Sequence, residues 1–219
     1  MQREEETSLV APSDEDLVRR VLSGEAACFE LLMRRNNQRL FRTVRSVVTD
    51  NDEAEDVMQE AYVAAFTHLR QFAGRSQFST WLTRIALNEA FARTKRTKRL
   101  TTLDEVSGEE ASMSSTAQGP EQRASERELG VILEDAVDSL PEPFRTVFVL
   151  RSVEQLSVAE TSEVLDIPEE TVKTRLHRAR NQLRHLLTER VGAQLPRLYD
   201  LHLSRCDRIV ARVSARLGR

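Results

Sequence analysis

The sequence predicts an all-α protein: two small helical domains joined by a flexible acidic linker, the second domain a helix-turn-helix, followed by a C-terminal helical extension. Three observations predict this class. Only 7 Gly and 6 Pro occur among 219 residues, whereas the helix-favouring Leu, Ala, Arg and Glu are abundant. Apolar residues recur at spacings of three and four in several segments. Residues 101–127 lose this period and are rich in Ser, Thr, Glu and Gly, as expected of a linker.

The first domain is expected over residues 13–99 as a bundle of helices. Ser13 to Asp16 has the form of a capping box, and Gly24 can end the short helix that follows. A longer helix is predicted from Glu25 to about Val48, and a fourth over roughly 78–98. The third helix between them has the clearest period, carried by Ala54, Val57, Met58, Ala61, Tyr62, Ala65, Phe66 and Leu69.

Two segments are predicted to have no fixed structure: an acidic start over residues 1–12 and an acidic linker over residues 100–127. The linker cannot bury enough apolar area to offset the entropy lost on ordering it. Fully stretched, residues 101–127 could span ~90 Å, which exceeds the ~70 Å covered by two turns of B-DNA. Two domains joined in this way can hold sites far apart on one duplex.

The second domain is expected over residues 128–190. An amphipathic helix begins near Glu128 and is stopped by Pro141 and Pro143, and another helix runs from Phe144 to Arg151. Residues 191–219 follow as a basic amphipathic extension. Its apolar stripe is Cys206, Ile209, Val210, Val213 and Leu217, and its basic stripe is Arg205, Arg208, Arg212 and Arg216. Docking within the chain or onto a regulatory protein is favoured for this extension over an extra DNA contact.

A helix-turn-helix is predicted from Ser157 to Arg180. Ser157 and Glu160 form a capping box, the first helix runs to Leu165, and Asp166 to Pro168 make the turn. Such a helix can bind its own domain on one side and enter a major groove on the other. The buried side is Val172, Leu176, Ala179, Leu183 and Leu187, and the opposite side is Thr171, Lys173, Thr174, Arg175, Arg178 and Gln182. An ordinary helical hairpin with a basic face is the alternative.

The charges are segregated, which indicates separate surfaces for a basic protein and for an anionic polymer. Residues 1–16 hold six acids, whereas residues 84–99 hold six bases against Glu89 alone. The third helix carries a polar face opposite its apolar stripe, and that face fits a basic protein partner. An ordinary solvated face is the alternative. This polar face consists of Asp52, Glu53, Asp56, Gln59 and Glu60.

Composition argues against several classes of protein. No apolar stretch approaches the ~20 residues that cross a bilayer, so a cytoplasmic protein without membrane contact is expected. Cys28 and Cys206 have no partner at metal-ligand spacing and the four His form no cluster, so no metal or cofactor is expected. Two buried free thiols are favoured over a redox pair. Without a phosphate-binding Gly loop, metal triad or His-activated nucleophile, no catalytic residue is expected and an enzyme is disfavoured.

Four motifs in order resemble the extracytoplasmic-function (ECF) sigma factors of the sigma-70 family, and the resemblance covers about residues 13–188. The motif D-x-x-x-D-V-x-Q-E-A-Y from Asp52 is similar to the polymerase-binding helix of that family. The segment from Phe72 to Asn88 is similar to its promoter-melting segment. The segments Ser139–Val147 and Pro168–Arg180 are similar to its second domain.

This resemblance implies a fold of two helical domains and a role in transcription initiation, in a family that includes stress-response regulators. The first domain would bind the β′ clamp helices of core RNA polymerase and open the −10 promoter element. The second domain would bind the −35 element and the β flap, and an anti-sigma factor is an expected further partner. The polymerase-binding residues would be Asp52, Glu53, Asp56, Gln59 and Glu60.

The resemblance also implies which residues contact promoter DNA. Phe72 and Asn88 match positions that capture a flipped base, although Phe72 could equally end the core of its helix. Trp81 is assigned to the core because Leu82, Ile85 and Ala86 share its side. Residues expected at the −10 element are Phe72, Arg75, Ser76, Arg84, Asn88, Arg93 and Arg96. Residues expected at the −35 element are Pro168, Glu170, Thr171, Lys173, Thr174, Arg175, His177, Arg178 and Arg180.

Two adjacent positions depart from the family pattern, and one alternative function is kept. Glu169 and Glu170 stand where the family often has small or apolar residues, and carboxylates there repel phosphates, so the −35 sequence is not predicted. The alternative function is a helix-turn-helix regulator that binds duplex DNA without joining polymerase. It explains Ser157–Arg180 but neither the acidic helix nor the Phe72–Asn88 segment.

Overall fold

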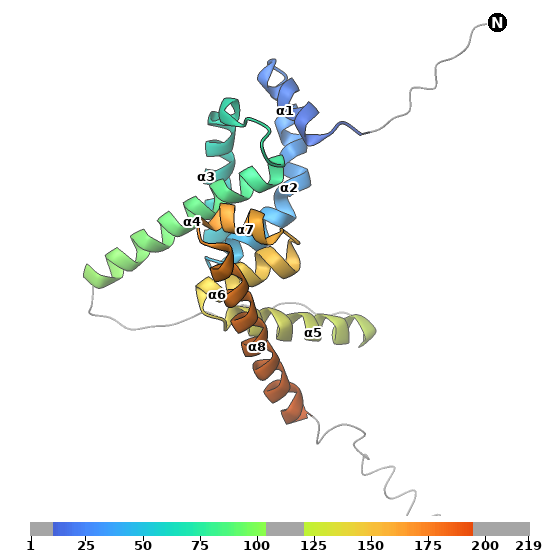
Figure 1. Cartoon of the computed structure of the whole chain (residues 1–219). Coiled ribbons are helices and arrows are strands. Elements are labelled where there is room, and N and C mark those ends of the chain that lie inside the picture. The colour runs from blue at the N-terminus through green and yellow to red at the C-terminus, as the bar shows by residue number, and fades with distance from the viewer. Residues whose placement is uncertain (1–10, 104–120, 195–219) are drawn as a thin grey trace, which may run out of the picture.

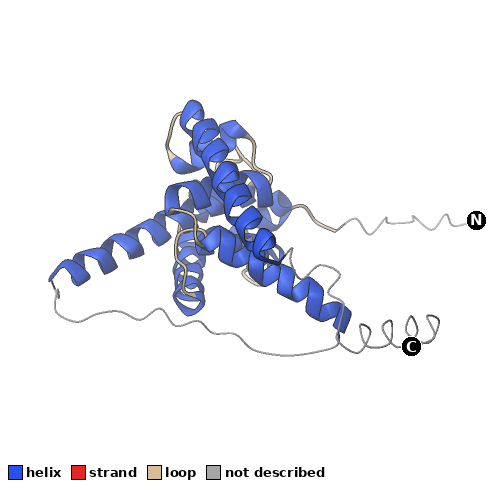
Figure 2. Cartoon of the chain, turned by 90° about the horizontal axis from the view of Figure 1, so that it is seen from below, coloured by secondary structure: helices blue, strands red, loops and turns tan. Residues whose placement is uncertain are grey.

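The computed structural model describes residues 11–103 and 121–194, and all the regular structure in these ranges is helical (Figures 1 and 2). The all-α prediction is therefore confirmed. The predictions for residues 1–10, 104–120 and 195–219 lie outside the described residues. They concern most of the acidic start, the centre of the linker, and most of the C-terminal extension with Cys206.

The first domain consists of α1 (Asp14–Leu22), α2 (Cys28–Arg45), α3 (Asn51–Thr67) and α4 (Phe78–Leu103), with a 3₁₀ turn at Leu69–Gln71. The predicted capping box of α1 is present. The Asp16 backbone N–H donates to Ser13 Oγ at 3.1 Å, and the Ser13 N–H donates to the Asp16 carboxylate at 3.2 Å. Gly24, at φ +109°, ends the turn after α1 in a conformation that favours glycine.

The apolar stripes of these helices meet in one core. On α3 the predicted positions Ala54, Val57, Ala61, Tyr62 and Ala65 are buried. They pack with residues of α2 and α4 such as Val44 and Leu82. Cys28 is a buried free thiol at the start of α2 and belongs to the same core. Figure 2 shows α4 continuing well beyond this bundle, so its last turns project away from the body of the domain.

The second domain consists of α5 (Glu121–Asp138), α6 (Glu142–Phe148), α7 (Val158–Leu165) and α8 (Glu169–Gln194), with a π-helical turn at Val149–Val153 after α6. Pro141 is the N-cap of α6, in agreement with the predicted break between helices. A separate small core holds α5 and α6 against α8. It contains Ala136, Leu140, Ala179 and Leu183, flanked by Val137, Phe144, Phe148 and Leu187.

Helix boundaries differ from the predicted ones at the edges of the linker. α4 continues to Leu103 and α5 begins at Glu121, so both helices enter the segment 100–127 that was predicted to be flexible. The prediction depended on apolar periodicity, which this segment lacks. Residues 121–127 are nevertheless mostly good helix formers, and Pro120 directly precedes them. α8 likewise runs to Gln194, past the predicted domain end at residue 190.

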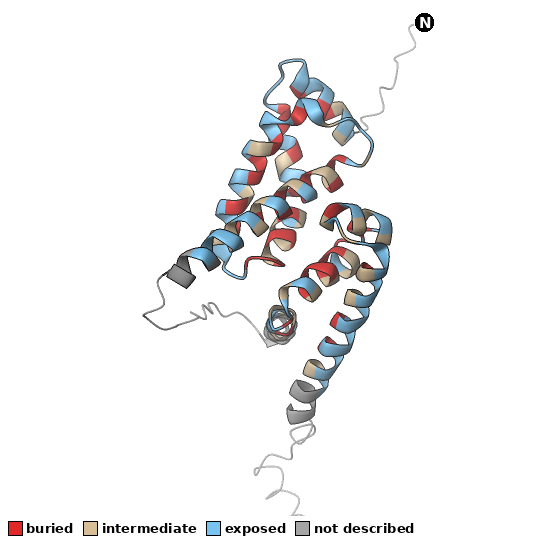
Figure 3. Cartoon of the chain, turned by 60° about the vertical axis from the view of Figure 1, so that its left-hand side comes forward, coloured by how far each residue is buried: buried red, intermediate tan, exposed pale blue. Residues whose placement is uncertain are grey.

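The two domains pack against each other in the structure. Figure 3 shows buried residues on the side of the second domain that faces the first. Leu150, Leu156 and Val164 of the second domain belong to the same buried cluster as the core of the first domain. Helix α7 lies against α4, and the turn after α6 lies against α2. The sequence predicts the helices on both sides of this contact, but it does not predict the contact.

Candidate nucleic-acid interface

The helix-turn-helix is formed by α7 and α8, and its geometry follows from local hydrogen bonds. The Glu160 N–H donates to Ser157 Oγ at 3.1 Å, and the Ser157 N–H donates to Glu160 Oε2 at 2.8 Å, so the predicted capping box is present. Asp166 ends α7 at φ +52°, in the left-handed region that Asp tolerates better than most residues. The Ser162 hydroxyl then donates to the Ile167 carbonyl at 2.5 Å and closes the turn.

The second helix of this motif, α8, presents the predicted polar face to solvent. Its inner side is buried through Val172, Ala179 and Leu183. Thr171 and Arg175 are half-buried and lie between the two sides. The exposed members of the predicted −35 set are Pro168, Glu170, Lys173, Thr174, His177, Arg178 and Arg180. This helix therefore has the buried stripe and the exposed basic face that major-groove binding requires.

Glu170, whose carboxylate would repel DNA phosphates, forms an ion pair in the structure. Lys173 Nζ lies 2.6 Å from Glu170 Oε1, one turn along α8. The hydrogen bond from the Lys173 ammonium to Glu170, together with the charge of Glu170, raises the pKa of that lysine. The pair partly cancels the repulsion that a lone carboxylate would exert on a phosphate. It also engages Lys173, the one lysine among the residues expected at DNA.

The acidic face of α3 is exposed, as its position opposite the apolar stripe requires. Asp52, Asp56, Gln59 and Glu60 are exposed, and Glu53 is half-buried. Arg93 of α4 reaches this face, with Nη2 at 3.4 Å from Glu60 Oε1 and 4.0 Å from Asp56 Oδ2. The structure thus joins a residue expected at promoter DNA to residues expected at polymerase. Arg93 therefore connects α4 to the acidic face of α3, a contact that the sequence did not indicate.

An apolar hollow lies beside the acidic face, between α2 and α3. Its volume is about 360 Å³, and the sequence reasoning did not identify it. Tyr62 closes one side, and its hydroxyl donates to Asn37 Oδ1 at 2.8 Å and to the Met33 carbonyl at 3.1 Å. Burial raises the pKa of Tyr62 well above its ordinary value. The lining residues are Met33, Asn37, Gln38, Phe41, Glu55, Met58, Gln59 and Tyr62.

Three aromatic rings meet where the loop after α3 enters α4. The Phe72 ring centroid lies 5.7 Å from that of Phe78 and 5.5 Å from that of Trp81. Phe78 is buried, whereas Phe72 and Trp81 are half-buried and pack on the edge of the core. The structure therefore gives Phe72 a packing role at the core, and it retains a partly open ring for stacking.

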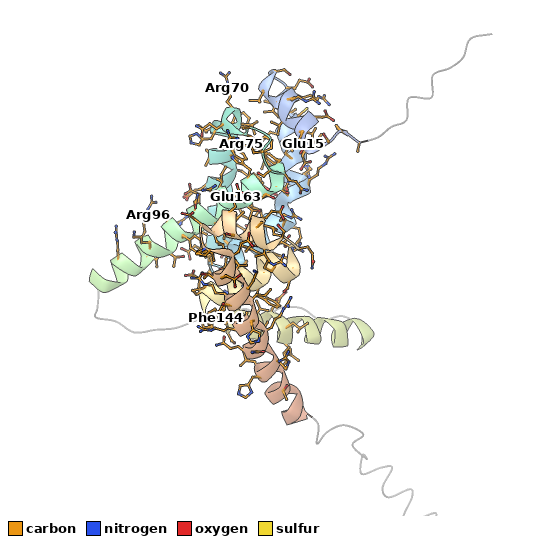
Figure 4. All side chains as sticks on the ribbon, viewed as in Figure 1. Glu15, Arg70, Arg75, Arg96, Phe144 and Glu163 are labelled. Carbon is orange, nitrogen blue, oxygen red and sulfur yellow. The ribbon has the colours of Figure 1, made fainter. Side chains whose placement is uncertain are left out.

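The other residues expected at the −10 element spread along α4 and the loop before it. Arg75, Arg84, Asn88 and Arg96 are exposed, and Ser76 is half-buried. Figure 4 places Arg75 near the upper end of the first domain and Arg96 on the projecting part of α4. Most of these side chains are thus open to solvent along α4 and the loop before it, as contact with a nucleic-acid backbone requires.

Two further properties concern the described residues only. In residues 11–103 and 121–194, no group of three or more His, Cys, Asp or Glu is placed to hold a metal ion. In the same part of the chain, no helix has both the length and the apolar composition needed to cross a membrane.

Comparison with known proteins gives matches to both domains. Residues 32–100 match the family "Sigma-70 region 2", and residues 130–183 match "Sigma-70, region 4". Among solved structures, CnrH in complex with the cytosolic domain of CnrY has a TM-score of 0.58 at 27% identity, with 81% of this chain and 99% of CnrH covered. RpoE of Bartonella quintana, solved with the anti-sigma factor NepR, has a TM-score of 0.59 at 23% identity, covering 73% of this chain and 96% of RpoE, and supports the fold alone.

Similar sequences agree with these matches. The ECF RNA polymerase sigma factor SigW of Bacillus subtilis is 35% identical over 178 residues, which cover 78% of this chain and 95% of SigW. The RNA polymerase sigma-H factor of Pseudomonas aeruginosa is 32% identical over 80% of this chain and 94% of its own length. The ECF sigma-E factor of Escherichia coli is 33% identical over 78% of this chain and 92% of its own length. The chain therefore belongs to the sigma-70 family and, within it, to the ECF RNA polymerase sigma factors.

Proposed function

We propose that this sigma factor binds core RNA polymerase through the acidic face of α3, opens the −10 element with α4 and the loop before it, and anchors on the −35 element through α8. The observation that carries this proposal is the exposed acidic face of α3, because a helix-turn-helix regulator has no use for it. The factor would work without a catalytic step of its own, and in the cytoplasm, where polymerase and promoter DNA meet.

Charge and shape together support the polymerase contact. Asp52, Asp56 and Glu60 point a row of carboxylates outward from a rigid helix, which suits a basic helical partner. The hollow beside them, with Met33, Phe41 and Met58 in its lining, supplies the apolar surface that an anchor residue of the partner requires. The β′ clamp helices would occupy this combined surface, and the β flap would contact the second domain.

Side chains that can hold single-stranded bases support the melting step. Strand opening without ATP requires that unpaired bases be captured as they leave the duplex. The half-buried Phe72 ring offers a stacking surface, and the exposed Asn88 amide offers edge hydrogen bonds. Exposed arginines along α4, including Arg84 and Arg96, would follow the phosphate backbone.

The exposed face of α8 supports the −35 contact. Arg178 and Arg180 are free to reach base edges or phosphates, and Thr174 offers a hydroxyl on the same helix. The Glu170–Lys173 pair would act mainly on sequence preference, since its net charge is near zero. A regulatory protein, such as the expected anti-sigma factor, is included among the partners, because the similar CnrH was solved in complex with the cytosolic domain of another protein, CnrY.

The test is a comparison of core binding and promoter opening. The full-length chain is mixed with sigma-free core polymerase and supercoiled promoter DNA, and single-stranded thymines are detected with permanganate. The double variant Asp56→Asn/Glu60→Gln should weaken core binding, whereas Glu15→Gln, an exposed neutralisation on α1, should not. Duplex binding by a protein that neither binds core nor opens DNA would support the regulator function instead.

A further inference from the structure

The small core of the second domain is incompletely covered. Its buried apolar cluster contains Ala136, Leu140, Ala179 and Leu183, and the flanking Val137, Phe144, Phe148 and Leu187 are only partly buried. Leu133 of α5 and Val153, after α6, are more open still, at 43% and 41% exposed. Burial of apolar side chains is the main stabilising contribution in a domain of this size. The second domain therefore has apolar surface that a further element of structure would cover.

A groove of about 670 Å³ lies over this apolar surface, and we call it the α5–α8 groove. Its charged lining residues differ from helix to helix. Glu134 and Asp138 come from α5, whereas Arg42 and Arg45 come from α2; the buried Arg145 donates to the backbone carbonyls of Ser46 and Asp138. The apolar lining residues are Phe41, Leu133, Val137, Phe148, Val149, Val153, Leu183 and Leu187. The groove thus has an apolar lining with acids on one helix and bases on another.

The sequence that follows α8 contains a segment with the pattern of a helix that packs on other helices. It lies in residues 195–219, outside the described residues, so the pattern is that of the sequence alone. Leu203 extends the apolar stripe predicted from Cys206 to Leu217. The extended stripe alternates steps of four and three in the manner of a helix packed along a seam. Its positions are Leu203, Cys206, Val210, Val213 and Leu217.

The two flanks of this predicted helix differ in charge. At 3.6 residues per turn, the arginine row falls on one flank of the apolar stripe, and Asp207 falls on the other. The row is Arg205, Arg208, Arg212 and Arg216. With the stripe in the groove, one of the two directions of the helix places the arginines toward Glu134 and Asp138. The same direction places Asp207 toward the arginines of α2, so the segment and the groove are complementary in charge as well as in apolar surface.

The point at which α8 ends allows this segment to return to the groove. Leu187 lines the groove, and α8 continues past it to Gln194, a rise of ~10 Å. Pro196 then opposes continuation of the helix. Residues 195–202 can span up to ~27 Å, which is more than the rise they must reverse. A tethered segment also has an effective concentration on the order of 1 mM, which a second copy or a separate partner would have to match.

We propose that residues 203–217 of this chain bind in the α5–α8 groove as a helix and complete the core of the second domain. The apolar stripe contacts α5 and α8, and the arginine row faces the acids of α5. This inference goes beyond the proposed function and does not rest on it, because it concerns the free chain without polymerase or DNA. It assigns a role to the part of the sequence that the two matched family regions leave out.

The first experiment measures hydrogen–deuterium exchange of the full-length chain by mass spectrometry. If about nine molecules in ten are docked, and amides of residues 131–138 exchange only from the undocked state, these amides exchange about tenfold more slowly than in an undocked chain. Val210→Asp/Val213→Asp should abolish this protection. Ala211→Asp/Ala215→Asp adds the same charge on the opposite side of the predicted helix and should retain it. Equal exchange in the wild type and the first variant, or equal loss of protection in both variants, would overturn the proposal.

The second experiment changes the groove and follows the segment. Leu133→Asp places a carboxylate among the lining residues, and Val131→Asp places one on the same helix at a position that is 56% exposed and does not line the groove. Amides of residues 203–217 should exchange faster in Leu133→Asp and at the wild-type rate in Val131→Asp. Circular dichroism checks that both variants keep the wild-type helix content. The same exchange rate in both variants would show that the segment does not occupy this groove.

The third experiment distinguishes docking within one chain from docking between two copies. The mass of the wild type is measured by light scattering, and the exchange of residues 131–138 is repeated over a hundredfold range of protein concentration. A monomer mass with protection that does not change with concentration supports docking within the chain. A doubled mass with protection that rises with concentration would mean that a second copy fills the groove, and would overturn the proposal.

Discussion

Glu154 accepts a hydrogen bond from Nε of Arg42 at 2.5 Å, although 112 positions separate the two residues in the chain. Arg42 lies on α2 in the first domain, and Glu154 lies shortly before the helix-turn-helix of the second. This contact therefore joins the two domains.

Arg178→Ala tests the −35 surface. Arg178 is exposed on α8, away from the buried Ala179 side, so its removal should leave the fold intact. The substitution should weaken −35 duplex binding by about 1–3 kcal/mol if Arg178 contacts a base. Fluorescence anisotropy with a labelled duplex measures the change. Arg19→Ala, on α1, serves as a charge-matched control, and an affinity equal to that of this control would remove Arg178 from the interface.

Asn88→Ala tests the capture of a flipped base. Its amide is exposed on α4 and makes no contribution to the core, so the helix should be retained. Permanganate reactivity of the −10 region should fall while affinity for core polymerase stays at the wild-type value. Thr97→Ala, an exposed substitution farther along α4, provides the comparison. Equal losses of opening and of core binding would contradict the role of Asn88 in melting.

Glu160→Gln tests the capping box of α7 through its pH dependence. Hydrogen bonds from the backbone and then the side chain of Ser157 hold the pKa of Glu160 below its ordinary value of 4.5. A carboxyl with a lowered pKa in the folded state stabilises the fold above its unfolded pKa, and this stabilisation is lost as pH falls through the folded pKa. The amide of Gln keeps an acceptor but cannot carry the charge.

The free energy of unfolding of wild type should therefore exceed that of Glu160→Gln above about pH 5, and the difference should shrink as the pH falls below 4.5. Urea titrations at several pH values measure it. Glu163→Gln, on the same helix, is the control: it measures how much the loss of an exposed acid alone changes the free energy of unfolding. A difference between wild type and Glu160→Gln that stays constant with pH would show that the charge of Glu160 does not stabilise the cap.

Tyr62→Phe tests the hydrogen bonds that join α3 to α2. The substitution removes the donor to Asn37 and Met33 while it keeps the buried ring, which packs against Phe29. Loss of these bonds should destabilise the first domain by about 1 kcal/mol. Thermal unfolding measures the change. Thr67→Val removes an exposed hydroxyl on the same helix and should have a smaller effect; equal effects would mean that the Tyr62 hydroxyl is not important for stability.

Much of the fold and of the exposed site could be predicted because the signals are local. The capping boxes at Ser13 and Ser157 depend on residues three positions apart. The buried positions of α3 and α8 depend on spacings of three and four. A face opposite such a stripe points away from the helix's own core, which is why most acids of α3 and most bases of α8 could be placed at the surface.

Some features escaped prediction because no local signal marks them. The start of α5 at Glu121 depends on helix propensity without an apolar stripe, so a search for periodicity misses it. Arg93 was expected at DNA, but its contact with Glu60 depends on how α4 crosses α3. The hollow near Phe41 likewise exists only between two packed helices.

The sequence by itself determined the helices, their inner and outer faces, and the membership of the chain in the sigma factors, because each follows from short-range patterns in the order of residues. Only the tertiary structure decided that the two domains close on each other. The closure depends on Glu154 with Arg42 and on Arg145 with Ser46. Nothing in the sequence around these charged and polar residues indicates which residues they contact. Their partners lie about a hundred positions away, and no periodic pattern extends over that distance.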